Sequence, residues 1–226
     1  MQTTLTKRAT AEALATGLLV ATIVGSGIMA NRLAGGNVAI ALLANTLATG
    51  AALVALILTF GPVSGAHMNP VVTLAMAIER KQPWSELPAY VVAQIAGGVG
   101  GTVATHAMFG VPLIAQSQHV RQGGAQMFSE FVATFGLLGV IWGCSRSRPT
   151  VVPFAVGAYI TAAYWFTAST SFANPAVAIA RCLTNTFSGI RPVDVLPFIL
   201  AEVAGAIAAT MFFRWLVPNS HVTEES

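Results

Sequence analysis

Two stretches of the chain decide its fold: SGAHMNPVVTLA at residues 64–75 and SFANPAVAIA at residues 171–180. Each places an Asn-Pro step within an otherwise apolar run. Asn is a favoured N-cap residue, and Pro suits the first position of a helix, because the N–H group that it lacks has no helical partner there. The sequence therefore predicts that one helix begins at residue 70 and another at residue 175.

The composition of the whole chain is typical of a membrane protein. Of its 226 residues, 55% are hydrophobic and 8% are charged, and the mean hydropathy is +0.71. A soluble domain carries about 25% charged residues, so this chain lacks the polar side chains that cover a soluble globule. The net charge of +3 is small and dispersed, which argues against nucleic acid as a partner. The two cysteines, Cys144 and Cys182, have no metal-binding or redox spacing, and the sequence predicts no metal site and no cofactor.

Six apolar runs of about 20 residues are long enough to cross a hydrocarbon core of about 30 Å. They cover residues 11–31, 38–60, 87–109, 126–145, 151–169 and 193–216. Two further apolar stretches, at about 62–79 and 171–185, keep only about ten residues of helical pattern after their prolines, which cover about 15 Å or half of the membrane. The predicted fold is therefore an all-α integral membrane protein with six transmembrane helices and two re-entrant half-helices.

The distribution of Lys and Arg predicts the orientation, because cytoplasmic segments carry the excess of positive charge. With both termini inside, the cytoplasmic segments hold Lys7, Arg8, Arg80, Lys81, Arg146, Arg148 and Arg214, and the outer segments hold Arg32, Arg121, Arg181 and Arg191. A cleaved signal peptide is an alternative for the first run, but no small-residue cleavage site is followed by a soluble domain. We therefore expect a retained first span, and both termini on the cytoplasmic side of the plasma (inner) membrane.

Three landmarks recur in the same order in the two halves of the chain. They are a Glu early in a span (Glu12 and Glu130), the Asn-Pro step (Asn69 and Asn174), and a polar residue before small ones (Gln94 and Glu202). Each half holds three spans, an odd number, so the second half is inverted relative to the first, and inverted repeats place the functional site near the midplane. The sequence predicts a single channel domain over 1–226, with repeats at about 9–115 and 125–217.

The two predicted half-helices enter from opposite sides and meet at their N-termini. Each N-terminus carries about half a positive charge, so the meeting point repels cations, protons included. The side-chain amides of Asn69 and Asn174 are donors, and the carbonyl groups of residues 65–67 and 171–173 are acceptors. Such a path suits small neutral molecules that bear hydroxyl groups. The alternative is that both loops are packed and dry.

The motifs SGAHMNPV (64–71) and FANPA (172–176), with Glu12, Glu130 and Gln94, resemble those of the aquaporin (major intrinsic protein) family. The resemblance extends over residues 9–216 and implies a homotetramer with one pore in each subunit. It implies that Asn69, Pro70, Val71, Asn174, Pro175 and Ala176 form the pore midplane. It also implies that Glu12 and Glu130 brace the re-entrant loops and that His67 supports the first loop by hydrogen bonding.

The chain departs from the family pattern at two places. Val71 replaces the usual alanine of the first motif, and Val177 stands where the family typically has an arginine at the outer constriction. Carried over by spacing, the constriction positions are Thr49, Tyr164, Ser171 and Val177. This set predicts a wider and less charged constriction than that of a water filter.

Arg181 lies one helical turn beyond Val177 on the same helix face. It either restores a positive charge in the outer vestibule or extends its charged end to the membrane surface, and the second interpretation is favoured. For the neighbouring Cys182, ordinary packing is favoured over a role with thiophilic solutes.

The leading hypothesis is a passive channel for small uncharged solutes, namely glycerol-like polyols, arsenite and related metalloid hydroxides, together with water. In lacking this arginine, the chain resembles the bacterial aquaglyceroporins of arsenic-resistance operons. The alternatives are a water-selective aquaporin and a coupled secondary transporter, which also uses broken helices at the midplane. An intramembrane enzyme is disfavoured, because the sequence has no Ser-His pair at motif spacing, no HExxH motif and no paired aspartates.

Overall fold

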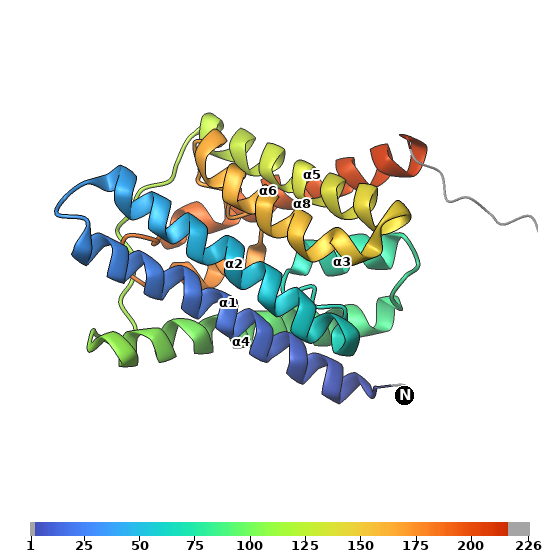
Figure 1. The fold of residues 1–226 in the computed structure, drawn as a ribbon, viewed down its shortest axis with the longest axis horizontal. Helices are drawn as coiled ribbons and strands as arrows, with labels where there is room; N and C mark the ends of the chain where they lie inside the picture. The colour runs from blue at the N-terminus through green and yellow to red at the C-terminus, as the bar shows by residue number, and fades with distance from the viewer. Residues whose placement is uncertain (1–2, 217–226) are drawn as a thin grey trace, which may run out of the picture.

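The computed structural model describes residues 3–216, and the helices of this part form an elongated bundle (Figure 1). In chain order they are α1 (Leu5–Leu33), α2 (Val38–Ser64), α3 (Pro70–Ile78), the 3₁₀ turn η1 (Trp84–Glu86), α4 (Leu87–Phe109), α5 (Gly124–Ser147), the 3₁₀ turn η2 (Pro149–Val151), α6 (Val152–Phe166), α7 (Pro175–Arg181) and α8 (Pro192–Leu216). Helix α1 begins and α8 ends at the same end of the bundle. An even number of crossings, as predicted, accounts for this arrangement.

Five helical segments of the described chain are long and apolar enough to cross a membrane: α1, α2, η1 with α4, α5 and α8. The fifth predicted span, residues 151–169, is shorter than expected. Helix α6 has 15 residues and is preceded by the three-residue turn η2. It ends at Phe166, three residues before the predicted end at 169, because Thr167 already has an extended backbone (φ −107°, ψ 139°) and begins the second re-entrant loop. The all-helical membrane fold is confirmed, with this correction to the fifth of the predicted runs.

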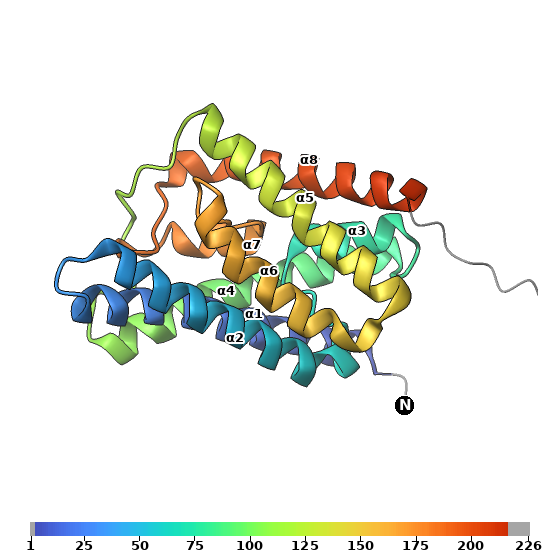
Figure 2. The same ribbon diagram turned by 45° about the horizontal axis from the view of Figure 1, so that its top comes forward.

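The two half-helices lie between the long helices and on opposite halves of the long axis (Figure 2). Helix α3 has nine residues and α7 has seven. The predicted stretch at 62–79 starts too early, since α2 continues through Pro62 to Ser64. It stops there because Gly65 adopts a left-handed conformation (φ 91°), which a glycine enters without steric cost.

The packing of the helices follows the repeat in the sequence. Helix α1 packs along α4, and its counterpart α5 packs along α8, while α2 and α6 join the two halves. Two equivalent glycines allow the close approach within each half. A Cβ atom at Gly97 would lie 2.0 Å from the Ala13 carbonyl oxygen, and one at Gly205 would lie 2.5 Å from the Phe131 carbonyl oxygen. Small residues let membrane helices approach closely enough for backbone contact, which explains why small residues follow Gln94 and Glu202.

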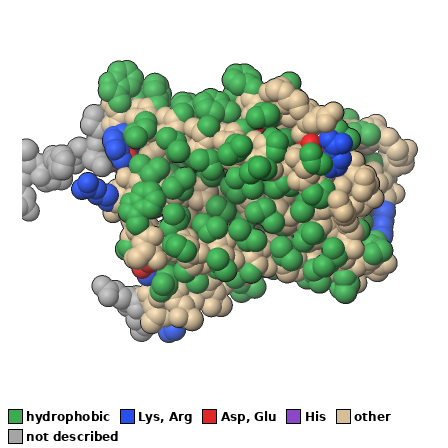
Figure 3. Space-filling model, turned by 180° about the vertical axis from the view of Figure 1, so that it is seen from behind, with side chains coloured by type: hydrophobic (Ala, Val, Ile, Leu, Met, Phe, Trp, Pro, Cys, Tyr) green, Lys and Arg blue, Asp and Glu red, His purple; other side chains and the backbone are tan. Residues whose placement is uncertain are grey.

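The face of the molecule in Figure 3 carries a broad apolar belt, with charged side chains near the two ends of the bundle. Exposed apolar side chains include Leu14, Leu43, Leu47 and Leu200, each with about half of its surface or more accessible. A soluble protein rarely exposes a continuous apolar area of this kind. The belt fits the hydrocarbon core of a bilayer, and the charged ends fit its two polar interfaces.

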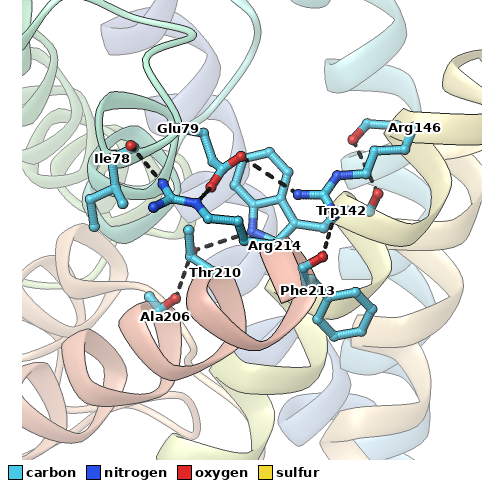
Figure 4. A network of polar contacts seen from close by, with 9 residues as sticks. Ile78, Glu79, Trp142, Arg146, Ala206, Thr210, Phe213 and Arg214 are labelled. Carbon is cyan, nitrogen blue, oxygen red and sulfur yellow. Dashed lines mark hydrogen bonds and ion pairs between the residues drawn. The ribbon is translucent and has the colours of Figure 1, made fainter. Parts of the chain in front are cut away.

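A cluster of ionic contacts ties the end of α3 to the ends of α5 and α8 (Figure 4). The Glu79 carboxylate, whose side chain is 3% exposed, accepts a hydrogen bond of 2.8 Å from Arg214 Nε and lies 3.5 Å from Arg146 Nη2. The guanidinium group of Arg146 also contacts the Phe213 carbonyl oxygen and lies 5.9 Å from the Trp142 ring. A half-helix has only one end in the membrane interface, and this cluster fixes that end.

We expect Glu79→Ala to lower the free energy of unfolding by about 3 kcal/mol, because it removes a buried carboxylate from Arg146, whose side chain is 7% exposed. The contact with Arg214, which is 49% exposed, contributes less. Denaturant titration of the detergent-solubilised protein measures the change. Glu86→Ala is the matched control, since the Arg8–Glu86 pair at the same end of the bundle is more exposed (25% and 16%) and should contribute about 1 kcal/mol or less. Equal losses in the two variants would contradict an anchoring role for Glu79.

Candidate functional site

The two Asn-Pro steps begin helices, as the sequence predicts. Asn69 precedes α3, and its side-chain oxygen accepts a hydrogen bond of 3.0 Å from the Val71 N–H. Asn174 precedes α7, and its side-chain oxygen accepts from Ala176 and Val177 at 3.0 and 3.3 Å. Each asparagine therefore caps its own half-helix, with proline at the first helical position.

The asparagine amides also join the two loops to each other. Asn69 Nδ2 donates to the carbonyl oxygen of Ala173, and Asn174 Nδ2 donates to that of Met68, both at 2.7 Å. The sequence predicts that these amides donate into the pore, and the structure shows that each also donates to the opposite loop. A carboxamide nitrogen carries two hydrogens, and one of them binds the opposite loop.

The first loop is held from behind by the Glu12 carboxylate, which is fully buried. It accepts hydrogen bonds from the backbone N–H groups of His67 (2.9 Å) and Met68 (2.7 Å). It also accepts from Ser64 Oγ at 2.7 Å and from Gln94 Nε2 at 2.8 Å. Hydrogen bonds to an ionised group are the stronger ones, so this carboxylate fixes the path of the loop.

The second loop is held in the same way by two carboxylates. Glu130 accepts from the N–H groups of Phe172 (2.9 Å) and Ala173 (2.7 Å), and Glu202 accepts from the N–H group of Asn174 (2.9 Å). Glu202 is the repeat counterpart of Gln94, so an amide in the first half corresponds to a carboxyl group in the second.

Both loops place non-glycine residues in the left-handed region of backbone conformation. Ala66 and Met68 (φ 48° and 50°) in the first loop correspond to Ser171 and Ala173 (φ 51° and 48°) in the second. Such residues cost about 1–3 kcal/mol each and persist only where the surroundings hold them. Here the carboxylates described above hold them.

The hydrogen bonds to the carboxylates also fix the direction of the loop carbonyl groups. A trans peptide is planar, and its C=O group points opposite to the N–H group of the next residue. Because the N–H groups of His67 and Met68 point at Glu12, the carbonyl groups of Ala66 and His67 point away from it. The same reasoning turns the carbonyl groups of Ser171 and Phe172 away from Glu130. The two loops therefore present a row of acceptors on the side opposite to their carboxylates.

A cavity of about 120 Å³ runs along these loops, much more than the roughly 10–15 Å³ that one water molecule needs. It is lined by the loops, at residues 65–69 and 171–174. The apolar part of its lining consists of Leu19, Ile23, Leu53, Ile57, Val72, Met76, Leu137, Ile141, Val152, Val156 and Ile160. A dry, closed contact between the loops, the alternative left open by the sequence, does not agree with this cavity.

The four positions assigned to the constriction by spacing all line this cavity: Thr49, Tyr164, Ser171 and Val177. Thr49 on α2 and Tyr164 on α6 come from different halves, and their hydroxyl oxygens lie 3.3 Å apart. The Ser171 hydroxyl is buried and has no hydrogen-bond partner among the described residues. Val177 adds a short apolar side chain that is 2% exposed.

The structure corrects the expectation for Arg181. Its side chain does not extend to the membrane surface, because the residue is 1% exposed and lines the cavity. Cys182, the next residue, is not among the cavity-lining residues and packs against the apolar core.

The two histidines inside the bundle both have partners. His67 lines the cavity, and its Nδ1 lies 3.1 Å from Thr73 Oγ1 on α3, which agrees with support of the first loop. His106 lies on α4, and the sequence alone shows no partner for it. Its Nε2 lies 2.7 Å from Thr184 Oγ1 and its Nδ1 lies 3.0 Å from the Leu113 carbonyl oxygen. It therefore joins the segments that follow α4 and α7.

Arg121 is a second buried arginine that the sequence places only among the outer charges. It is 8% exposed, its Nε donates to the Gly189 carbonyl oxygen (2.9 Å) and its Nη1 to that of Ser169 (2.8 Å). Burial lowers the pKa of Arg121 to about 10, so the group remains charged at neutral pH. The sequence does not predict the contact between Arg121 and Ser169, because 48 residues separate them along the chain.

Comparisons with known proteins agree with the motifs and with this geometry. The family model described as major intrinsic protein matches residues 1–171, and it ends just before the second Asn-Pro step. The chain is 55% identical to Aquaglyceroporin AqpS of Rhizobium meliloti (strain 1021) over 213 residues, which cover 94% of this chain and 91% of that protein. It is 36% identical to Aquaporin NIP1-4 of Oryza sativa subsp. japonica over 165 residues, 68% of this chain and 58% of that protein.

Among solved structures, the aquaglyceroporin from Plasmodium falciparum matches with a TM-score of 0.71 at 19% identity, covering 95% of this chain and 98% of that one. At this identity the match shows the fold alone, and it confirms the predicted fold class. The resemblance read from the two motifs is confirmed by the family model and by the relatives together. This chain belongs to the major intrinsic protein family.

Proposed function

We propose that the chain is a passive transmembrane channel for small uncharged solutes, namely glycerol-like polyols, arsenite and related metalloid hydroxides, together with water. One observation carries the proposal. The cavity combines the polar backbone and asparagines of the two loops with many apolar side chains from the surrounding helices. A polyol has the same mixed character, with hydroxyl groups that bind acceptors and a carbon chain that prefers apolar contact.

The midplane of this path is formed by Asn69, Pro70, Val71, Asn174, Pro175 and Ala176, and Glu12, Glu130 and His67 support its loops. The helix N-termini at this point carry partial positive charge, which disfavours cations. The cavity offers hydrogen bonds without offering a negative charge, so a neutral hydroxylated molecule loses little when it leaves water.

The solute range depends on the constriction of Thr49, Tyr164, Ser171 and Val177. Three of these side chains are small, and the fourth position supplies a ring hydroxyl. Arsenite at neutral pH is a neutral trihydroxide and displays its hydroxyl groups much as glycerol does. The name of the relative at 55% identity, an aquaglyceroporin, supports a solute larger than water.

A flux comparison in proteoliposomes tests the proposal. We expect the purified chain to speed glycerol-driven swelling and arsenite entry well above the rates of empty liposomes, together with osmotic water flow. Water flow without glycerol or arsenite entry would overturn the proposal and leave a water-selective aquaporin.

A coupled secondary transporter is less well supported by the cavity. Coupling requires titratable groups that face the solute, and the buried carboxylates of Glu12, Glu130 and Glu202 instead accept hydrogen bonds from loop N–H groups. Among the described residues that line the cavity there is no carboxylate. Glycerol flux that does not change when a pH gradient or a membrane potential is imposed would support the channel.

We further propose that the protein is a homotetramer in the plasma (inner) membrane, with both termini cytoplasmic and a pore in each subunit. The two ends of the described chain lie at one end of the bundle, which supports termini on the same side of the membrane. The bias of Lys and Arg favours the cytoplasm as that side.

A further inference from the structure

Arg181 lies where two cavities meet. Arg181 on α7 lines the central cavity and also a second cavity, which we call the outer vestibule. The vestibule is lined by Val38, Leu42, Asn45, His119, Val120, Arg121, Gln126, Ala168, Thr170, Arg181, Phe187 and Ser188. Among the described residues, Arg181 is the one that lines both spaces, so a solute that passes between them passes this side chain.

The Arg181 guanidinium is held in place without a carboxylate. Its Nε donates to the Ser188 carbonyl oxygen, and its Cζ lies 3.4 Å from the centroid of the Phe172 ring. The face of an aromatic ring is negative and attracts a cation. The four ion pairs of the described residues join Arg8 to Glu86, Arg146 to Glu79, Arg214 to Glu79 and Arg191 to Asp194, so none of them neutralises Arg181.

The outer part of the guanidinium has donors without a partner. Arg181 Nη1 is buried and has no hydrogen-bond partner among the described residues. A buried charge that is neither paired nor fully hydrogen-bonded is costly, and in membrane proteins such groups usually face a water-filled path. The arrangement is explained if water and passing solutes in the cavity provide the missing partner.

The position of Arg181 relative to Val177 indicates what its charge can do. The two residues are one turn apart on α7, and both line the cavity. We propose that Arg181 supplies the positive charge of the constriction from one turn farther out, and so determines charge selectivity in a pore whose position 177 is a valine. It repels cations and donates a hydrogen bond to the oxygen of a neutral hydroxylated solute, while the short valine leaves room for that solute. This inference rests on the proposed channel function and adds a second barrier to cations beside the partial positive charge of the two half-helix N-termini.

The test measures proton entry and glycerol flux in the same proteoliposomes. Proton entry is driven by a potassium diffusion potential and followed with an entrapped pH-sensitive dye. We expect Arg181→Gln to raise the ratio of proton entry to glycerol flux by about tenfold or more, because it removes a unit charge a few ångströms from the path. Arg181→Lys keeps the charge and should keep the ratio close to that of the wild type. Arg181→Met provides a second neutral variant if Arg181→Gln is not recovered as a folded protein.

Arg32→Gln is the matched control, because Arg32 also lies over a phenylalanine ring (Phe109, 5.2 Å) but is exposed and lines neither cavity. We expect no change in its ratio. A neutral variant at position 181 with the wild-type ratio would overturn the inference, and so would an Arg181→Lys variant that leaks as much as the neutral one. Failure of the proposed function is distinguishable, since the wild-type chain would then show no glycerol flux above that of empty liposomes.

Discussion

Val177→Arg should reduce the flux of glycerol and arsenite at least about tenfold while part of the water flux survives, because pore width and lining charge set which solutes pass. The valine is 2% exposed and lines the cavity together with Thr49, Tyr164 and Ser171. An arginine has a much longer side chain and carries a charge, so it fills space that a polyol needs. Stopped-flow swelling in glycerol and shrinkage in an impermeant osmolyte measure the two fluxes in the same vesicles.

Two further variants separate the width of the pore from its charge. Val177→Leu narrows the path without adding charge, and we expect a smaller loss of glycerol flux than with arginine. The double variant Val177→Arg with Arg181→Val moves the positive charge one turn inward and avoids two like charges at i and i+4. It should restrict solutes as strongly as Val177→Arg does. Unchanged glycerol flux in Val177→Arg would show that position 177 is not at the constriction.

Glu130→Ala should abolish the folded second loop. The substitution leaves the N–H groups of Phe172 and Ala173 without their acceptor, in a place where Glu130 is 0% exposed. Hydrogen bonds to charged groups contribute about 1.5–3 kcal/mol each, so the loss is about 3–6 kcal/mol, a large part of the stability of a typical domain. We expect little folded protein in the membrane fraction, and no solute flux from what is recovered.

Graded variants show whether this loss comes from the missing acceptor. Glu130→Gln keeps one acceptor oxygen and should lose less stability than Glu130→Ala. Glu202→Gln should lose least, because the equivalent residue of the first half is Gln94, whose amide donates to Glu12. Wild-type stability and flux in Glu130→Ala would contradict the role of this carboxylate in holding the loop.

The sequence predicts those features that depend on local chemistry and on the repeat. Two short motifs predict the family and the positions, after Asn69 and Asn174, at which the half-helices begin. The length of the apolar runs predicts the membrane fold. The spacing of 105 residues between the two asparagines also recurs in the backbone, where Ala66 and Ser171 share the same left-handed conformation. At the two Asn-Pro steps local preference and tertiary structure agree, which is why the prediction of the helix starts succeeds there.

The errors have a common physical cause, since they concern contacts between distant segments. Arg181 was expected at the membrane surface because long basic side chains usually extend there, but Ser188 and Phe172 hold it inside. His106 contacts Leu113 and Thr184, which lie on two different loops. The sequence around His106 does not indicate either partner. The asparagine amides are predicted to donate into the pore, and the sequence does not show that each also binds the opposite half of the chain. Side-chain contacts of this kind depend on how the two halves dock, which no local pattern encodes.

The most direct test of the channel itself is the initial rate of glycerol-driven swelling of proteoliposomes that contain the wild-type chain. The cavity between the two Asn-Pro loops predicts a rate at least about tenfold above that of empty liposomes, because the acceptor row replaces the hydration that glycerol loses. The rate should be the same with and without a pH gradient. A rate equal to that of empty liposomes, in vesicles that still pass water quickly, would contradict the account.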